Sequence, residues 1–326
     1  MTDISFNQDY NTMEDHQYRY AMKAIEESNI RLGVLLQSEH LSIAGLDRKL
    51  FPKSVTAGRN FVRFLRLLLK KRLQTTKSEA SADTDSRDIF SFLERCRDPE
   101  TGTALNKTEI STETATFVVA GADTTSTTLS ALSHYLTGSS RWYRNAAAEV
   151  RTTFSSLEDI KLGAKLNSCS ILRACLDESL RLSPPGGSAL WREVESGGAV
   201  IDGQLIAQGC DVGVGIYAIH HDGKYWPNAL QYEPMRWLDQ SDAKDVRRPY
   251  VPFSSGPRSC VGKPLAIAQV MLTFARLLYE FDIRRADSSP SWAEPGESET
   301  EPSEYPLRDH VSARKEGPLL VFRRRN

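Results

Sequence analysis

Residues 253–262 read F-S-S-G-P-R-S-C-V-G, and an apolar helical pattern from about Lys263 to Tyr279 follows directly. This segment contains Cys260 in a turn rich in glycine and proline, just before the expected helix. Because the start of a helix favours negative charge, such a turn can present a thiolate to a metal. A single thiolate without His or Cys neighbours does not make a zinc site, which needs about four protein ligands. It does suit an axial ligand to haem (heme) iron, because the porphyrin supplies the other donors.

The bulk composition is ordinary for a soluble globular protein. The chain has 326 residues, of which 40% are hydrophobic and 25% charged, and its formal net charge is −1. This balance gives no reason to expect nucleic-acid binding. Five scattered cysteines favour a reduced compartment without a disulfide framework. The sequence has no apolar run of 18 residues that would span a membrane, and its polar, acidic start lacks the features of a secretory signal.

Most of the chain follows helical periodicity. We predict helices at about 15–38, 57–74, 88–97, 106–136, 142–153, 168–182 and 263–279. Short β-like runs lie at 199–201, 204–207 and 211–217, and a loop region is expected over 220–250. We therefore expect a mainly α-helical fold with a small β region, formed by one domain over residues 1–326.

Two polar segments, 74–88 and 287–304, predict flexible loops because they contain few apolar residues. The helical stretch at 57–74 combines an apolar face with many basic residues. Such a helix can lie on an acidic membrane surface, but packing on the core with a solvated basic face is the more common arrangement.

The stretch N-K-T-E at 106–109 predicts a capping box, in which Asn106 and Glu109 cap the following helix. The middle of that helix reads A-G-A-D-T-T at 120–125, and glycine and threonine are poor helix formers. A buried helix whose centre consists of poor helix formers indicates a functional segment.

Four segments together resemble the cytochrome P-450 family of haem-thiolate monooxygenases. The Cys260 segment matches the family's haem-binding loop F-x-x-G-x-R-x-C-x-G at every defined position, and A-G-A-D-T-T matches its oxygen-activation motif. E-S-L-R at 178–181 matches the family's E-x-x-R, and Y-E-P-M-R-W at 232–237 resembles the segment before its haem loop. E-x-x-R alone is a weak signal, since such pairs are common on exposed helices. The ten-residue cysteine loop is the specific one.

The resemblance implies that Cys260 is the metal ligand, bound to haem iron as a thiolate that favours O–O cleavage. Phe253 would pack against the porphyrin, and Gly256 and Gly262 would let the backbone pass close to it in special dihedrals. An inert buried thiol is the alternative for Cys260.

Two arginines would contact the haem propionates, because a guanidinium pairs well with a carboxylate. Arg258 lies in the cysteine loop, and Arg192 is placed like the family's second propionate ligand. A plain arginine at a strand edge is the alternative for Arg192.

The resemblance further implies that Asp123 and Thr124 are the catalytic residues on the distal side of the haem, where they would hold a proton relay. Gly121 would leave room for dioxygen beside the cofactor. The alternative for Thr124 is a hydrogen bond to its own helix. An apolar wall from Phe117, Ala120 and the segment 186–191 suits a hydrophobic substrate.

A structural role is implied for Glu178, Arg181 and Arg236. They would form a buried ion network that holds the loop before Cys260. Removal of one partner would leave a buried charge unpaired, at a cost of about 3–5 kcal/mol.

The resemblance, closest to fungal-like members, implies a monooxygenase that hydroxylates or epoxidises a hydrophobic small molecule such as a terpenoid, polyketide or aromatic compound. It would use O2 and electrons from NADPH through NADPH-cytochrome reductase. The protein would lie on the cytoplasmic side of the endoplasmic reticulum, where it could make a peripheral contact with the membrane.

Two alternatives stay open. The family's oxygen-activation helix lies far from the N-terminus, whereas here it starts near residue 106. We therefore expect an N-terminally truncated, C-terminal portion of the family fold, which could be a non-catalytic remnant that binds haem poorly or not at all. A haem-thiolate isomerase or dehydratase that needs no external electrons is the other alternative, and Asp123 and Thr124 argue against it.

Overall fold

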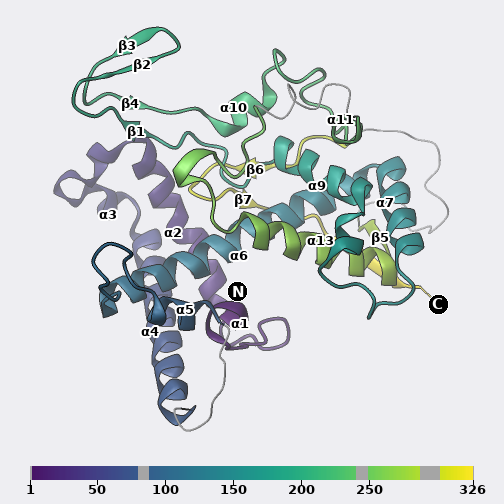
Figure 1. Cartoon of the computed structure of the whole chain (residues 1–326), viewed down its shortest axis with the longest axis horizontal. Coiled ribbons are helices and arrows are strands. Elements are labelled where there is room, and N and C mark those ends of the chain that lie inside the picture. The colour runs from purple at the N-terminus through teal and green to yellow at the C-terminus, as the bar shows by residue number, and fades with distance from the viewer. Residues whose placement is uncertain (1, 80–87, 240–248, 287–301, 326) are drawn as a thin grey trace. The chain divides into compact units, whose positions relative to one another are not determined.

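We describe the chain from a computed structural model covering residues 2–79, 88–239, 249–286 and 302–325. The chain forms two compact units. Figure 1 labels their helices and strands where there is room. Unit 1 comprises Met1–Thr124 and His310–Ser312, and unit 2 comprises Thr125–Asp309 and Ala313–Asn326. The single domain expected from the sequence stays a prediction.

Unit 1 is built from helices. They are α1 (Thr2–Phe6), α2 (Tyr20–Gln37), the 3-10 segment η1 (Glu39–Gly45), α3 (Leu46–Leu50), α4 (Pro52–Glu79), α5 (Ile89–Arg95) and the first part of α6 (Lys107–Gly138). The core lies between α2 and α4. Phe61, Phe64 and Leu68 of α4 share one helical face and pack in the same apolar cluster as Ala24 and Ile25 of α2.

Helix α4 is longer than its sequence pattern predicts. It starts at Pro52, a residue suited to the first turn of a helix, and it continues to Glu79. The loop predicted over 74–88 is therefore wrong for 74–79, where no Gly or Pro interrupts the backbone hydrogen bonds. Residues 80–87 lie outside the described residues.

The predicted capping box at the start of α6 is confirmed. The backbone N–H groups of Thr108 and Glu109 donate to Asn106 Oδ1 at 2.9 and 3.0 Å. In return, the Asn106 N–H donates to Glu109 Oε2 at 2.6 Å. Two N-terminal donors of a 32-residue helix are thereby paired by the cap side chain.

Unit 2 consists mainly of helices and includes the second part of α6. They are α7 (Ser140–Thr153), α8 (Ala164–Asn167), α9 (Ser170–Leu182), α10 (Ile216–His221), α11 (Met235–Leu238), the 3-10 turn η2 (Gly256–Arg258) and α13 (Lys263–Glu280). Helices α7, α9 and α13 lie against one another (Figure 1). They bury an apolar cluster that includes Leu132, Val150, Leu176 and Phe274. Helix α9 ends before Pro184, as predicted.

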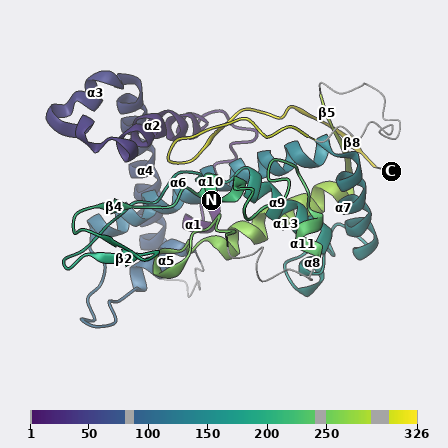
Figure 2. The same ribbon diagram turned by 90° about the horizontal axis from the view of Figure 1, so that it is seen from above.

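The strands described in unit 2 form four small antiparallel sheets. These pair β1 (Arg192–Glu193) with β4 (Asp211–Val212), β2 (Ala199–Ile201) with β3 (Gln204–Ile206), β5 (Phe281–Arg285) with β8 (Leu320–Arg324), and β6 (Leu307–Arg308) with β7 (Arg314–Lys315). Figure 2 shows β5 beside β8, whose register pairs Ile283 with Phe322. A mainly α-helical fold with a small β region is therefore confirmed.

The predicted β run at 211–217 is wrong beyond Val212. Residues 216–221 form α10, because a helical turn buries Ile216 and His220, four residues apart, on one side. The loop expected over 220–250 also contains the short helix α11.

The second predicted flexible loop, 287–304, falls mostly outside the described residues. Residues 302–304 form neither helix nor strand, and the Ser303 carbonyl is 2.8 Å from His134 Nε2. Within the part of the chain that the structure describes, no helix has both the length and the apolar character needed to cross a bilayer.

Candidate functional site

The loop that carries Cys260 is held by its own backbone. The Cys260 N–H donates to the Phe253 carbonyl at 2.9 Å, which closes residues 253–260 into a ring. Ser254 and Gly256 have φ values of +58° and +75°, in the left-handed region that glycine tolerates best. The loop therefore delivers Cys260 to the N-terminus of α13 in a defined conformation.

Cys260 is an exposed, free thiol, so the alternative of an inert buried cysteine does not hold. Cys96 and Cys210 are also exposed, but neither lies in such a loop. Cys175 is buried, and its burial raises the thiol pKa to about 12. Cys175 therefore stays protonated and is unsuited to bind a metal as thiolate.

Gly262, Gly256 and Phe253 differ in conformation and burial. A Cβ added to Gly262 would lie 3.8 Å from the Cys260 sulfur, so glycine keeps that side of the sulfur open. The special dihedrals predicted for both glycines are present at Gly256 but wrong for Gly262, whose φ of −79° suits any residue in the first turn of a helix. Phe253 is half-buried against the core of unit 2.

The two predicted propionate ligands are exposed. Arg258 lies in η2, and its guanidinium has no hydrogen bond or ion pair within the described chain. Arg192 on β1 donates to the carbonyls of Leu190 and Trp191 at 3.3 and 2.7 Å, and among the described residues it has no carboxylate partner. Both charges can therefore pair with the carboxylates of a bound group. An accessible thiol, a glycine beside it and two such guanidinium groups fit a haem.

The residues predicted for the distal side lie on α6 in unit 1, whereas Cys260 belongs to unit 2. Asp123 is buried, and its Oδ2 accepts a hydrogen bond from Asn29 Nδ2 at 3.0 Å. The Thr124 hydroxyl donates to the Ala120 carbonyl at 2.6 Å, as its structural alternative foresees. A hydroxyl that donates its proton in this way can still accept a hydrogen bond at its oxygen. Gly121 is half-buried within the same helix.

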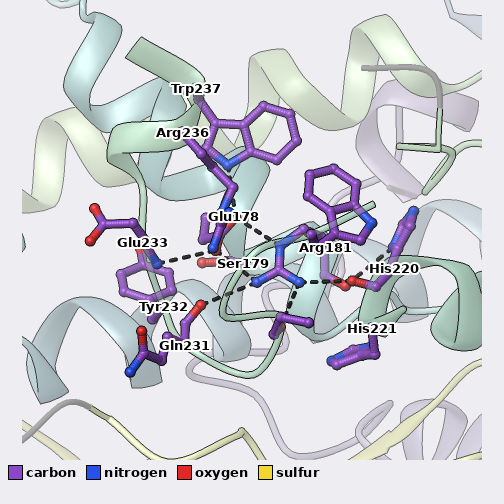
Figure 3. A network of polar contacts seen from close by, with 12 residues as sticks. Glu178, Ser179, Arg181, His220, His221, Gln231, Tyr232, Glu233, Arg236 and Trp237 are labelled. Carbon is purple, nitrogen blue, oxygen red and sulfur yellow. Dashed lines mark hydrogen bonds and ion pairs between the residues drawn. The ribbon is translucent and has the colours of Figure 1, made fainter. Parts of the chain in front are cut away.

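The structure brings Glu178, Arg181 and Arg236 together (Figure 3). Glu178 and Arg181 lie on α9 with fully buried side chains. Arg181 binds the carboxylate with two hydrogen bonds, from Nη2 to Oε1 at 2.8 Å and from Nε to Oε2 at 3.0 Å. Arg236 Nε donates to the same Oε1 at 3.1 Å.

Further donors and acceptors complete this ion network. The Trp237 indole N–H donates to Glu178 Oε2 at 2.9 Å, and the Glu233 backbone N–H donates to Oε1 at 3.1 Å. The other N–H groups of Arg181 bind three carbonyls at 2.7–3.1 Å, those of His220, Ala229 and Gln231. A buried pair with such complete hydrogen bonding holds residues 220–237 against α9.

His220 and Tyr250 also join this region, and the sequence pattern does not single them out. The Val251 N–H donates to His220 Nε2 at 2.9 Å, and the Tyr250 hydroxyl donates to Asp177 Oδ1 at 2.9 Å. A signal for Trp237 exists, since the 232–237 motif ends in an aromatic residue. No local pattern distinguishes His220 from a surface histidine.

Comparisons with known proteins match nearly the whole chain, including the residues of the site described above. The sequence model of the family described as Cytochrome P450 matches residues 1–301. The cytochrome P450 monooxygenase lcsN of Purpureocillium lilacinum is 58% identical over 99% of this chain and 95% of its own length. A cytochrome P450 monooxygenase of Gibberella zeae is 46% identical over the whole chain and 75% of its own length. The cytochrome P450 monooxygenase poxM of Penicillium oxalicum is 44% identical over 99% of this chain and 60% of its own length.

Proposed function

The chain belongs to the cytochrome P450 family, and from this premise we propose that it is a haem-thiolate monooxygenase of fungal secondary metabolism. Its reaction inserts one atom of O2 into a hydrophobic small molecule, by hydroxylation or epoxidation. The names of the relatives, which are monooxygenases, support this class of reaction.

The observation that carries the proposal is the exposed Cys260 thiol at the start of α13. Its sulfur is accessible, and Gly262 leaves one side of it open. We assign Cys260 as the residue that would bind the haem iron through its thiolate, and Arg258 and Arg192 as the residues that would pair with the haem propionates. When bound, the haem supplies the activation of O2, which thiolate ligation favours.

On the distal side, we assign proton delivery to Asp123 and Thr124. Asn29 holds one oxygen of the Asp123 carboxylate, so the group has a defined orientation. Because the Thr124 proton is used by the Ala120 carbonyl, the threonine oxygen acts as an acceptor and can hold a water molecule. In this role Gly121 leaves space beside the helix for dioxygen.

The overall reaction defines the partners. One O2, one NADPH and one proton convert the substrate into its oxygenated product, water and NADP⁺. An NADPH-cytochrome reductase delivers the two electrons. A terpenoid, polyketide or aromatic substrate agrees with the apolar residues Phe117 and Ala120 on α6 and Leu190.

The proposed location is the cytoplasmic side of the endoplasmic reticulum, with a peripheral contact to the membrane. The exposed residues Arg59, Arg63, Arg66 and Lys70 support this contact, since their spacing gathers them on one face of α4.

The test is a reduced carbon-monoxide difference spectrum of the full chain produced with a haem supply. We expect a thiolate-type Soret band that Cys260→Ala abolishes. Cys210→Ala is the matched control, because it removes another exposed, free thiol and should leave the band unchanged.

Three results would contradict the proposal. Failure of the wild-type chain to bind haem would favour the non-catalytic remnant. Persistence of the band in Cys260→Ala would overturn the ligand assignment. Conversion of a substrate by the haem-loaded chain without NADPH and reductase would favour an isomerase or dehydratase.

A further inference from the structure

We propose that His220 is a positioning residue that joins the end of α9 to Val251 and thereby holds the loop that carries Cys260. This inference rests on the proposed function for the role of Cys260. The geometry of the connection does not depend on it.

The imidazole of His220 is completely buried and makes a hydrogen bond at each ring nitrogen. Val251 donates its backbone N–H to Nε2 at 2.9 Å, so Nε2 has no proton. Nδ1 lies 3.2 Å from the Arg181 carbonyl and must therefore be the protonated nitrogen, which donates to that oxygen. Burial lowers the His220 pKa to about 3, and this keeps the ring in the neutral form that the two bonds require.

The connection continues through the backbone to the thiol. The Val251 carbonyl accepts a hydrogen bond from the Ser254 N–H at 2.9 Å. The neighbouring Phe253 carbonyl accepts from the Cys260 N–H at 2.9 Å. A continuous chain of hydrogen bonds and peptide units thus connects Arg181, through the His220 ring, to Cys260.

The ion network by itself does not reach this loop. Within the described chain, the hydrogen bonds of Glu178, Arg181 and Arg236 end at residues 220–237. His220 connects that region to Val251. The hydrogen-bonded connection from the network to the cysteine loop therefore runs through the imidazole.

Tyr250 strengthens the same attachment. Its hydroxyl donates to Asp177 Oδ1 of α9 at 2.9 Å, and its ring stacks on His220 with centroids 5.6 Å apart and an interplanar angle of 26°. The ring also packs on Trp237, with centroids 4.5 Å apart. Two consecutive residues, Tyr250 and Val251, are thus attached to α9 directly before the loop.

Two substitutions separate the two hydrogen bonds of the ring. In His220→Gln, the longer side chain can present an oxygen near the Nε2 position and accept from Val251. In His220→Asn, the shorter side chain can donate to the Arg181 carbonyl but does not reach Val251. Circular dichroism establishes that each variant is folded, and Tyr250→Phe provides a second variant that removes one hydrogen bond to α9.

The first measurement is amide hydrogen exchange of the full chain without haem. We expect His220→Asn to accelerate exchange in residues 251–262 about fivefold, the effect of one lost hydrogen bond. Residues 227–237 should exchange as in the wild type. His220→Gln should stay close to the wild type in both segments, and Tyr250→Phe should affect 251–262 only.

The second measurement is the fraction of the haem-loaded, reduced carbon-monoxide complex that shows the thiolate-type band. His220→Asn should lower this fraction severalfold, and His220→Gln should preserve it. Equal exchange in 251–262 for the wild type and His220→Asn would overturn the proposal, as would equal acceleration in 227–237. If the wild-type chain shows no thiolate-type band, the proposed function fails, while the exchange data still decide the role of His220.

Discussion

Replacement of Glu178 by glutamine tests the ion network most directly. Glu178 accepts hydrogen bonds from Arg181, Arg236, Trp237 and the Glu233 backbone, and its side chain is fully buried. Glu178→Gln keeps the shape but removes the charge. It also places an NH2 group where one carboxylate oxygen now receives at least two donors.

The expected cost follows from burial. Arg181 cannot lose its proton, so the substitution leaves an uncompensated cation whose side chain is inaccessible to water. Loss of one partner of a buried pair costs about 3–5 kcal/mol of unfolding free energy. This is a large part of the roughly 5–15 kcal/mol that stabilises a typical protein.

The chain offers a matched control. Glu280 pairs with Arg324 at 2.9 Å, close to the 2.8 Å between Glu178 and Arg181, but the Arg324 side chain is 78% exposed. Glu280→Gln removes the same charge from a surface pair and should cost at most about 1 kcal/mol. Urea unfolding followed by tryptophan fluorescence compares the two variants, since Trp237 reports from within the network.

The comparison has a clear refuting result. If Glu178→Gln and Glu280→Gln shift the unfolding free energy equally, the buried network adds no more stability than a surface ion pair. The role assigned to Glu178, Arg181 and Arg236 would then be wrong.

Three further predictions concern other parts of the molecule. His220 stays neutral when folded but takes up a proton below pH 6.5 when unfolded, so its contribution to stability is present above that pH and is lost as the pH falls towards 3. Between pH 7.5 and 5, urea unfolding of the wild type should therefore lose about 2 kcal/mol more stability than His220→Gln, and parallel pH profiles would contradict this. Thr124→Ala should raise peroxide release per NADPH consumed in the reductase-coupled reaction, whereas unchanged coupling would remove Thr124 from proton delivery. Asn106→Ala should lower the free energy of unfolding, measured by thermal unfolding, by about 1 kcal/mol, because the α6 cap is lost. Asn145→Ala, on the exposed face of α7, should leave it unchanged.

Sequence periodicity predicted most helices, because each buries a face whose residues recur every three or four positions. The capping box at Asn106 could likewise be predicted from the sequence, since both of its partners lie within one helical turn. Periodicity failed at residues 213–217, where a run that alternates like a strand is divided between a short Gly-rich segment, whose Gly215 pairs with Ala189 in an isolated bridge, and α10. Burial of Ile216 and His220 decides that case, and burial is a property of the packed chain.

By itself, the sequence determined the family and predicted the loop that carries Cys260, because the motif residues around Cys260 are neighbours along the chain. It also indicated Glu178 and Arg181 as a pair, since they are one helical turn apart. Only the tertiary structure decided what satisfies their buried charges and how they act on the cysteine loop. His220 lies 39 residues after Arg181 and 31 residues before Val251. Contacts over such separations form only when the packed core brings the segments together, so no local pattern of residues encodes them.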